Sequence, residues 1–273
     1  MTIIAMTREM GTLGKEVARE FARRRDFTVI HHELIETEDD RSRKREESEV
    51  YRFLEGSEEE LQKWRHNRAG GGYLTPAEVL EMALEGEVLI RGWGAARLLK
   101  AIPNVLSVRV CAPMDFRIAQ MEDRLGIDAR QARREIERSD AAHSRTFLRF
   151  FEADWRDALN YDVVLNTAHL DPGTCADILV DAAANPAFAP SEISRREIED
   201  RLIEARVRAA IRADPLLARR GRHVQVSVSG AAVRLYGVVT DGQSRKVAAD
   251  IAEAQEGVRE MHNEIAHASG FTD

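Results

Sequence analysis

The chain has 273 residues, 44% of them hydrophobic, a size and composition that favour one large packed domain and a smaller one. Its net charge of −7 argues against a general nucleic-acid-binding surface, and its two distant cysteines, Cys111 and Cys175, argue against a disulfide framework or a zinc site. Because the first apolar run is too short for a signal peptide and no uncharged stretch reaches the ~18 residues of a membrane span, we expect a cytoplasmic protein that is not integral to a membrane.

The first predicted element is an apolar strand over residues 2–6 that leads through a glycine-containing turn into an amphipathic helix. The turn carries Gly11 and Gly14, and Lys15 follows directly. Glycines let backbone amides approach an anion, the N-terminus of the following helix adds a partial positive charge, and a lysine can reach the terminal phosphates of a nucleotide. The segment therefore predicts nucleotide binding.

The turn departs from the strict P-loop pattern G-x-x-x-x-G-K-[ST] at two positions. Glu9 stands where the first glycine is expected, and Glu16 replaces the hydroxyl residue that binds magnesium. A glycine turn between a strand and a helix also begins any βα unit, so this segment alone leaves the nucleotide-binding and the purely structural interpretations open.

Short apolar runs alternate with longer helical patterns through the first two thirds of the chain. This alternation is typical of an α/β fold, with a parallel sheet that has helices on both faces. The predicted strands span Thr2–Met6, Thr28–Ile30, Val88–Ile90, Val105–Val110 and Val163–Leu165.

A charged segment, Glu36–Arg68, separates the second and third predicted strands and mixes acidic and basic residues as a solvated helical excursion would. Gly70–Gly72 interrupts it, and a new helix begins with Thr75 as its N-cap and Pro76 in its first position. We expect a mobile insertion between these two strands.

An arginine-rich helix or helical hairpin is predicted between Asp128 and Phe151. Acidic residues are interleaved with its arginines, which is typical of a salt-bridged exposed helix. The same arginines could form a lid that closes over transferring phosphates and offsets the charge of the transition state. The phosphate-binding turn favours the lid. The arginines are Arg130, Arg133, Arg134, Arg138, Arg145 and Arg149.

The chain changes character after the first predicted domain, residues 1–184. Residues 185–197 contain small residues and prolines and are predicted to form a linker. Residues 198–268 then show the order αββαβ: a helix that Asp214-Pro215 closes, two alternating strands, a second helix that Asp241-Gly242 opens, and a final strand. This second domain contains no constellation of acids, bases or metal ligands.

The first domain resembles the cytidylate kinase-like family, a branch of the P-loop nucleoside monophosphate kinases. The resemblance implies a P-loop kinase-type sheet with a helical lid, and transfer of the γ-phosphoryl group of ATP, with Mg²⁺, to a pyrimidine nucleoside monophosphate. It rests on Thr7–Ala18, Val88–Ala95, Arg117 and Arg124 after Ala112-Pro113, and Asp140, Arg145, Asp154-Trp155 and Tyr161-Asp162.

The resemblance also implies which residues meet ATP, and in this family Glu16 is a common trait. The phosphate cradle would consist of Gly11, Thr12, Leu13, Gly14, Lys15 and Glu16. The catalytic residues would be Lys15, Arg124, Arg133, Asp140 and Arg145, with the arginines as lid or acceptor-phosphate groups. Asp140 would either orient Arg145 or hold a magnesium-bound water. Direct metal ligands are left unassigned.

Four further residues are candidates for binding the phosphate acceptor. His32 and Glu33 follow the second strand, where such kinases begin their acceptor-binding region; the alternative is that they cap the next helix. Trp93 stands where related kinases carry an arginine, which leaves Arg91 as a substitute for that arginine. Trp93 itself either stacks on a base or packs in the fold.

The second domain resembles a BON domain, through Val224–Val226, Val233–Val239, Arg245, Ala248 and Gly257-Val258. The resemblance implies a non-catalytic module that binds a phospholipid surface, a protein partner or a ligand. Two hypotheses follow for the whole chain. The first is a nucleoside monophosphate kinase with a fused regulatory or docking module. The second is a catalytically weak nucleotide-binding regulator that acts through the BON module on a partner or a membrane surface.

Overall fold

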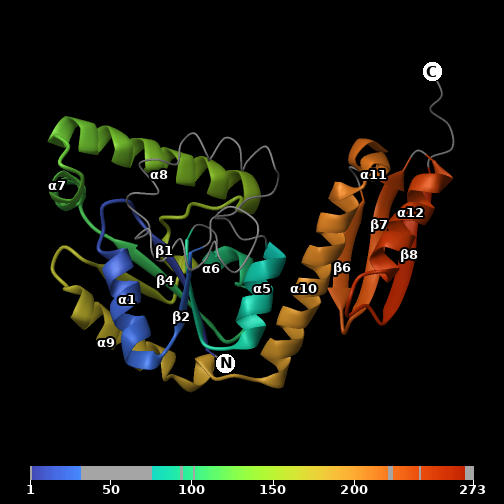
Figure 1. Ribbon diagram of the computed structural model, residues 1–273, viewed down its shortest axis with the longest axis horizontal. Coiled ribbons are helices and arrows are strands. Elements are labelled where there is room, and N and C mark those ends of the chain that lie inside the picture. The colour runs from blue at the N-terminus through green and yellow to red at the C-terminus, as the bar shows by residue number, and fades with distance from the viewer. Residues whose placement is uncertain are drawn as a thin grey trace. The chain divides into compact units, whose positions relative to one another are not determined.

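The computed structural model describes residues 2–31, 76–92, 95–100, 102–220, 224–239 and 241–267 (Figure 1). The chain divides into two compact units. The first comprises Met1–Thr75 with Glu85–Pro190, and the second comprises Pro76–Leu84 with Ser191–Asp273. The insertion that the sequence predicts over Glu36–Arg68 lies outside the described residues.

The first unit contains a sheet of five strands in the order β2-β3-β1-β4-β5. Every neighbouring pair is parallel, and in the centre Ile3 of β1 lies opposite Val88 of β3 and Val105 of β4. The predicted parallel α/β sheet is confirmed. Its strands are β1 (Ile3–Arg8), β2 (Thr28–His31), β3 (Val88–Arg91), β4 (Val105–Cys111) and β5 (Val163–Asn166).

Capping residues set the ends of several helices in the first unit. Asp128 caps one helix by accepting a hydrogen bond from the Gln131 amide, Asp171 caps another, and Gly126 ends a third with a φ of 64°. The helices are α1 (Gly14–Arg25), α6 (Ala95–Leu98), α7 (Met114–Leu125), α8 (Ala129–Phe151) and α9 (Pro172–Ala183); a 3-10 turn, η1 (Ala158–Asn160), precedes β5.

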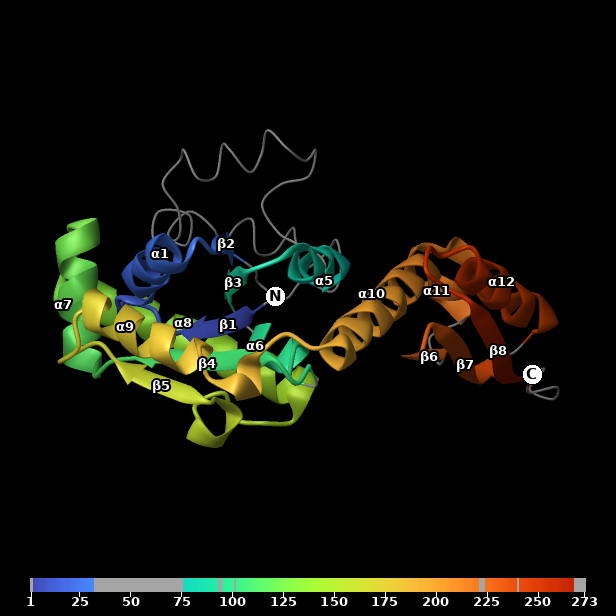
Figure 2. The same cartoon turned by 90° about the horizontal axis from the view of Figure 1, so that it is seen from below.

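Hydrophobic clusters among the described residues hold this unit together, and two of them surround the turn and the sheet that positions it. In the main cluster, Phe21 of α1 and Leu179 of α9 are buried against Leu106 of β4, and Figure 2 shows α1 and α9 side by side. The smaller cluster joins the turn after β1 to α7 and α8, with Met10 among its members and Ile136 contributed by α8. The turn therefore has α7 and α8 packed directly against it.

The second unit combines a three-stranded sheet with helices. Strand β7 pairs antiparallel with β6 and parallel with β8, so the predicted αββαβ order is confirmed. Its core includes Val207, Leu235 and Ala248. The elements are α10 (Glu192–Ala213), α11 (Pro215–Arg220), β6 (Gln225–Ser229), β7 (Ala232–Val239), α12 (Gly242–Glu253) and β8 (Glu260–His267).

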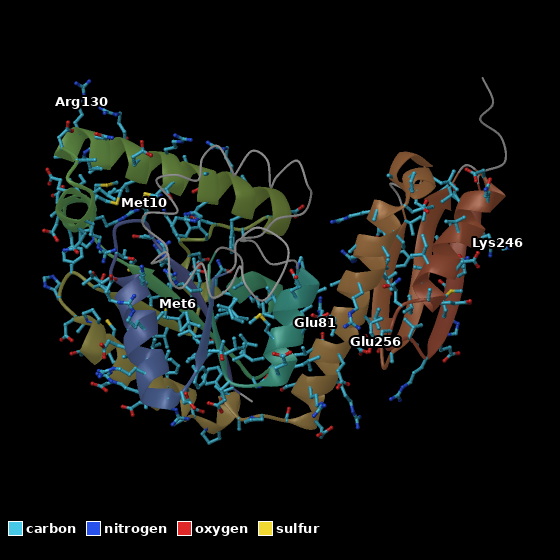
Figure 3. All side chains as sticks on the ribbon, viewed as in Figure 1. Met6, Met10, Glu81, Arg130, Lys246 and Glu256 are labelled. Carbon is cyan, nitrogen blue, oxygen red and sulfur yellow. The ribbon has the colours of Figure 1, made fainter. Side chains whose placement is uncertain are left out.

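Helix α5 (Pro76–Glu85) contributes its first nine residues to the second unit. There Arg206 of α10 pairs with Glu81 of α5 at 2.9 Å and with Glu256 at 3.0 Å (Figure 3). Helix α10 begins at Glu192, inside the stretch expected to be a linker, because the Ser191 hydroxyl accepts a hydrogen bond from the Ser194 amide and caps it. Within the described ranges, no helix is long and apolar enough to cross a bilayer.

Candidate active site

The turn between β1 and α1 is compact, and both of its glycines are needed. Gly11 has a φ of +79°, and a Cβ there would lie 2.7 Å from the Arg117 carbonyl oxygen. A Cβ on Gly14 would lie 2.9 Å from Cβ of Arg8. The Thr12 hydroxyl donates to the Glu9 carbonyl at 2.8 Å and closes the turn. Any larger side chain at Gly11 or Gly14 would push the turn away from its neighbours.

A small pocket opens at this turn, lined by Arg8, Met10, Gly11, Thr12, Lys15 and Arg124. Three of these residues are cations. Leu13, at the N-cap of α1, makes no side-chain capping bond to the first amides of the helix. Cationic side chains and a helix N-terminus together favour an anion such as a phosphate chain.

Glu16, in the first turn of α1, pairs with Arg124 of α7, the distance from Oε1 to Nη2 being 2.7 Å. This ion pair holds the Arg124 guanidinium at the pocket. The other carboxylate oxygen, Oε2, is buried and has no hydrogen-bond partner among the described residues. Glu16 therefore offers one committed and one uncommitted oxygen at the position where the strict pattern has a hydroxyl.

Glu9, the other departure from the pattern, is buried and neutralised. Arg109 of β4 donates to its Oε1 at 2.5 Å, and Arg117 of α7 lies 3.4 Å from its Oε2. The backbone amide of Ala112 donates to the same Oε2 at 3.3 Å. The carboxylate thus ties the turn to β4 and α7, and its charge is offset by two guanidinium groups.

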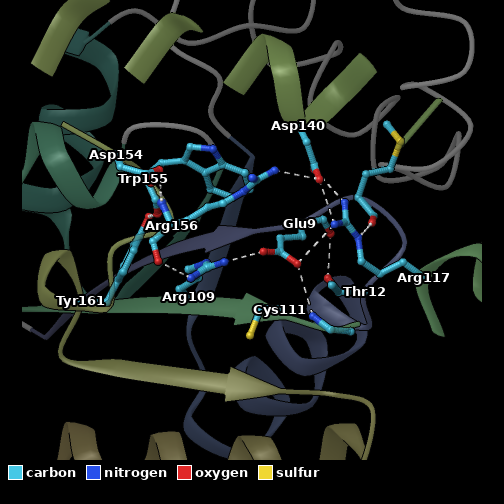
Figure 4. Close-up of polar contacts among 12 residues, drawn as sticks. Glu9, Thr12, Arg109, Cys111, Arg117, Asp140, Asp154, Trp155, Arg156 and Tyr161 are labelled. Atoms are coloured by element: carbon cyan, nitrogen blue, oxygen red, sulfur yellow. Dashed lines mark hydrogen bonds and ion pairs between the residues drawn. The ribbon is translucent and has the colours of Figure 1, made fainter. Parts of the chain in front are cut away.

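Arg117 and Asp140 continue this arrangement toward α8. Arg117 donates to both carboxylate oxygens of Asp140, at 3.0 and 2.7 Å, and through Nε to the Met10 carbonyl at 2.6 Å. Arg156 donates to Asp140 from the other side at 3.2 Å. We call Glu9, Arg109, Arg117, Asp140 and Arg156 the charge cluster; Figure 4 shows its continuous contacts.

Trp155 covers one side of the charge cluster. Its ring lies 5.4 Å from the Arg109 guanidinium and 5.5 Å from that of Arg156, both suited to cation–π contact. The indole Nε1 donates to the Ser144 hydroxyl of α8 at 3.0 Å, and the Tyr161 hydroxyl donates to the Trp155 carbonyl at 2.8 Å. The segment before β5 is therefore fastened to α8 and to the cluster.

The structure brings some of the sequence-predicted residues together and leaves others apart. Gly11, Thr12, Lys15 and Arg124 line one pocket, and Leu13, Gly14 and Glu16 lie at the start of α1 beside it. Asp140 is bonded to Arg117 and Arg156, so its carboxylate orients these two arginines, whereas the prediction paired it with Arg145.

The remaining candidates lie elsewhere. Arg133 and Arg145 occupy exposed positions of α8, and Arg133 approaches Asp115 at 3.6 Å. Arg91 is buried at the end of β3, opposite Met6 of β1. His32, Glu33 and Trp93 lie outside the described residues.

Sequence reasoning missed Arg8, Arg109 and Arg156. Arg109 had a detectable signal, because it is the one charged residue of strand β4, and a charge in a largely buried strand needs a partner. Arg8 ends β1 directly before the turn, a position from which a side chain reaches the loop. Arg156 had no local signal, since its partner is contributed by α8.

Residues 3–169 match the model of the cytidylate kinase-like family, and residues 199–268 match that of the BON domain. A curated cytidylate kinase from Sulfolobus acidocaldarius is 33% identical over 75 residues, which are 28% of this chain and 41% of that protein. The matched part therefore spans less than half the length of this relative.

Two solved structures are similar at low identity. An uncharacterized protein from Eubacterium ventriosum is 19% identical, with a TM-score of 0.45, over 67% of this chain and 97% of its own. A shikimate kinase from Bacteroides thetaiotaomicron is 14% identical, with a TM-score of 0.36, over 66% of this chain and 97% of its own.

Proposed function

The chain belongs to the cytidylate kinase-like family, and from this premise we propose that it is a cytoplasmic kinase that transfers the γ-phosphoryl group of ATP to a nucleoside monophosphate. A pyrimidine nucleotide such as CMP is the first candidate acceptor. The observation that carries the proposal is the pocket after β1, where Arg8, Lys15 and Arg124 surround a glycine turn at a helix N-terminus. Phosphoryl transfer needs little covalent help from a protein, so positioning and charge neutralisation suffice.

Within this proposal the pocket binds the ATP phosphates. Lys15 and Arg124 neutralise the terminal phosphates, and Arg8 adds a third positive charge from the end of β1. The first amides of α1 donate hydrogen bonds to phosphate oxygens. These groups are in place before the nucleotide arrives, which is how electrostatic stabilisation of a transition state is most effective.

One residue of the site, Glu16, has a carboxylate oxygen suited to bind Mg²⁺. Mg²⁺ prefers carboxylate and phosphate oxygens, and Oε2 of Glu16 is a buried carboxylate oxygen without a hydrogen-bond partner in the described part of the chain. A bound Mg²⁺ would neutralise phosphate charge. Glu9 and Asp140 are committed to arginines, so Glu16 is the acid we assign to the metal.

The roles of the other predicted residues belong to the same proposal. We assign Arg133 and Arg145 to a lid over the phosphates, and His32, Glu33, Arg91 and Trp93 to the acceptor. The domain over residues 198–268, joined to the kinase domain over residues 1–184 by residues 185–197, would regulate or dock the enzyme on a protein partner or a phospholipid surface, as the BON match suggests.

A coupled ADP-release assay over the common nucleoside monophosphates, with Mg²⁺ and ATP, tests the proposal. We expect turnover with at least one acceptor, and a fall in kcat/KM of about 100-fold or more in Lys15→Ala, because a charge aimed at the transferring phosphate is lost. Arg23→Ala is the control, since Arg23 is an exposed cation of the same helix that pairs with Glu20. The proposal is wrong if no acceptor supports ADP release and Lys15→Ala changes nothing.

The second candidate function is a nucleotide-binding regulator without appreciable turnover. The Glu16–Arg124 ion pair favours it, because the pair occupies the place of the metal-binding hydroxyl. Calorimetry separates the two functions: ATP binding without ADP production in the assay would support the regulator.

A further inference from the structure

The turn after β1 lacks the first glycine of the strict pattern, yet it closes tightly around a pocket. We propose that Arg117 and Asp140 are positioning residues that hold the Met10–Gly11 peptide in its anion-binding orientation, and that the charge cluster takes over the shaping role of the missing glycine. This inference rests on the proposed function, since it assumes that the pocket binds a phosphate chain.

The first step is the contact between Arg117 and the turn. Its Nε donates to the Met10 carbonyl at 2.6 Å. No described peptide bond is cis, so the Met10 C=O and the Gly11 N–H of the same peptide point in opposite directions. The bond therefore draws the carbonyl toward Arg117 and turns the Gly11 amide away from it. A carbonyl facing the pocket would repel a phosphate, whereas an amide attracts one.

A second contact fixes the same peptide independently of the side chain. Gly11 packs so closely on the Arg117 backbone that a Cβ would meet the Arg117 carbonyl oxygen at 2.7 Å and the carbonyl carbon at 3.1 Å. Arg117 thus contacts the turn twice: its backbone packs against Gly11, and its Nε donates to the Met10 carbonyl. The orientation of the turn is consequently set by where α7 places this one residue.

Asp140 holds the Arg117 side chain in place. The Arg117 side chain is 5% exposed, and Asp140 binds both terminal nitrogens of the guanidinium in a bidentate pair. A planar guanidinium held at two nitrogens can present Nε in only one direction, a geometry that a lysine ammonium cannot reproduce. Asp140 thus acts on the phosphate pocket through Arg117, although it lies on α8 and lines no part of that pocket.

Full-length Arg117→Lys and Asp140→Asn test the inference by calorimetric titration with ATP and with inorganic tripolyphosphate. We expect both variants to bind each ligand about tenfold more weakly or worse, because misplaced donors lose their alignment with the phosphates. Equal losses for the two ligands are expected, since the defect lies in the phosphate pocket. Leu179→Ala is the control: it removes packing between α9 and the sheet, so it should lower Tm and leave both affinities unchanged.

The amide resonance of Gly11 gives a readout that a merely structural role would not move. In the ¹⁵N spectrum of the wild-type protein this signal should shift on addition of tripolyphosphate, and in Arg117→Lys the shift should be lost. Asp140→Asn keeps the volume and one acceptor of the aspartate, so it decides the question if Arg117→Lys does not fold.

The outcomes separate this inference from the proposed function. Wild-type affinities in a folded Arg117→Lys or Asp140→Asn would overturn the inference and leave the kinase proposal intact. ATP binding by the wild type without phosphorylation of any acceptor would overturn the kinase proposal, while the variants would still decide the inference. A wild type that binds neither ATP nor tripolyphosphate would overturn both.

Discussion

Glu9 shows how the meaning of one residue depends on its neighbours in space. An unpaired acid beside a phosphate-binding turn would repel a nucleotide and favour a catalytically weak protein. In the structure the Glu9 carboxylate is bonded to Arg109 and lies 3.4 Å from Arg117. Its charge is therefore offset by two guanidinium groups, so the carboxylate repels a phosphate chain much less than a free acid would.

Tyr161 should make the stability of the protein depend on pH in the alkaline range. Its hydroxyl donates to the Trp155 carbonyl, and burial raises the pKa of the phenol to about 12. In the unfolded chain the phenol ionises near its usual value of about 10. The stability that the neutral phenol contributes is therefore complete below pH ~10 and is lost as the pH rises toward 12.

Urea unfolding at a series of pH values checks this. Tyr161→Phe should cost about 1 kcal/mol at neutral pH through the lost hydrogen bond, and its stability should fall less steeply than that of the wild type between pH ~10 and ~12. Parallel curves for the two proteins over that interval would contradict the assignment.

At the scale of elements, helix α8 has a buried face and an exposed face, whereas its role as a lid over phosphates stays a prediction. One face is buried and carries Ala132, Ile136 and Asp140. The arginines at 130, 133, 134, 138 and 145 are exposed, and Figure 3 shows Arg130 extending away from the helix. The helix is therefore anchored through its apolar face and Asp140, while these five arginines remain on the outside.

Asp128 caps the N-terminus of helix α8. The Asp128 carboxylate accepts a hydrogen bond from the Gln131 amide at 2.7 Å and satisfies one of the free donors of the first turn. Asp128→Ala should lower the free energy of unfolding by about 1 kcal/mol, whereas Asp128→Asn, which can also cap, should lose only a fraction of that. Chemical denaturation of the two variants tests the cap, and equal losses would show that the side chain stabilises α8 in another way.

Each of the two units has a hydrophobic core of its own among the described residues. One lies between the parallel sheet and helices α1 and α9, and the other includes Val207, Leu235 and Ala248 of the second unit. Because each unit has a core of its own, a single two-state transition is not expected for the chain.

Differential scanning calorimetry should accordingly resolve two unfolding transitions. Leu235→Ala, which removes a fully buried side chain, should destabilise the second unit by about 2–5 kcal/mol and move only one transition. Under the proposed function, ATP should raise the temperature of the other transition, because it would bind the folded first unit. One transition that both the substitution and ATP shift as a whole would show that the units unfold together.

Sequence patterns by themselves determined the fold class of both units and the position of the glycine turn after β1, because strand periodicity, glycines and helix caps are local features, and the motifs along the chain indicated the family. They also placed Lys15 and Gly11 in the pocket. Only the tertiary structure decided the surroundings of that pocket. Arg109 is 100 residues from Glu9, and Arg117 is 107 from Met10, so these contacts exist only once the sheet and α7 are assembled. The position of a charged side chain in the sequence does not indicate which distant residue it will pair with. The charge cluster could therefore be found only in the folded chain.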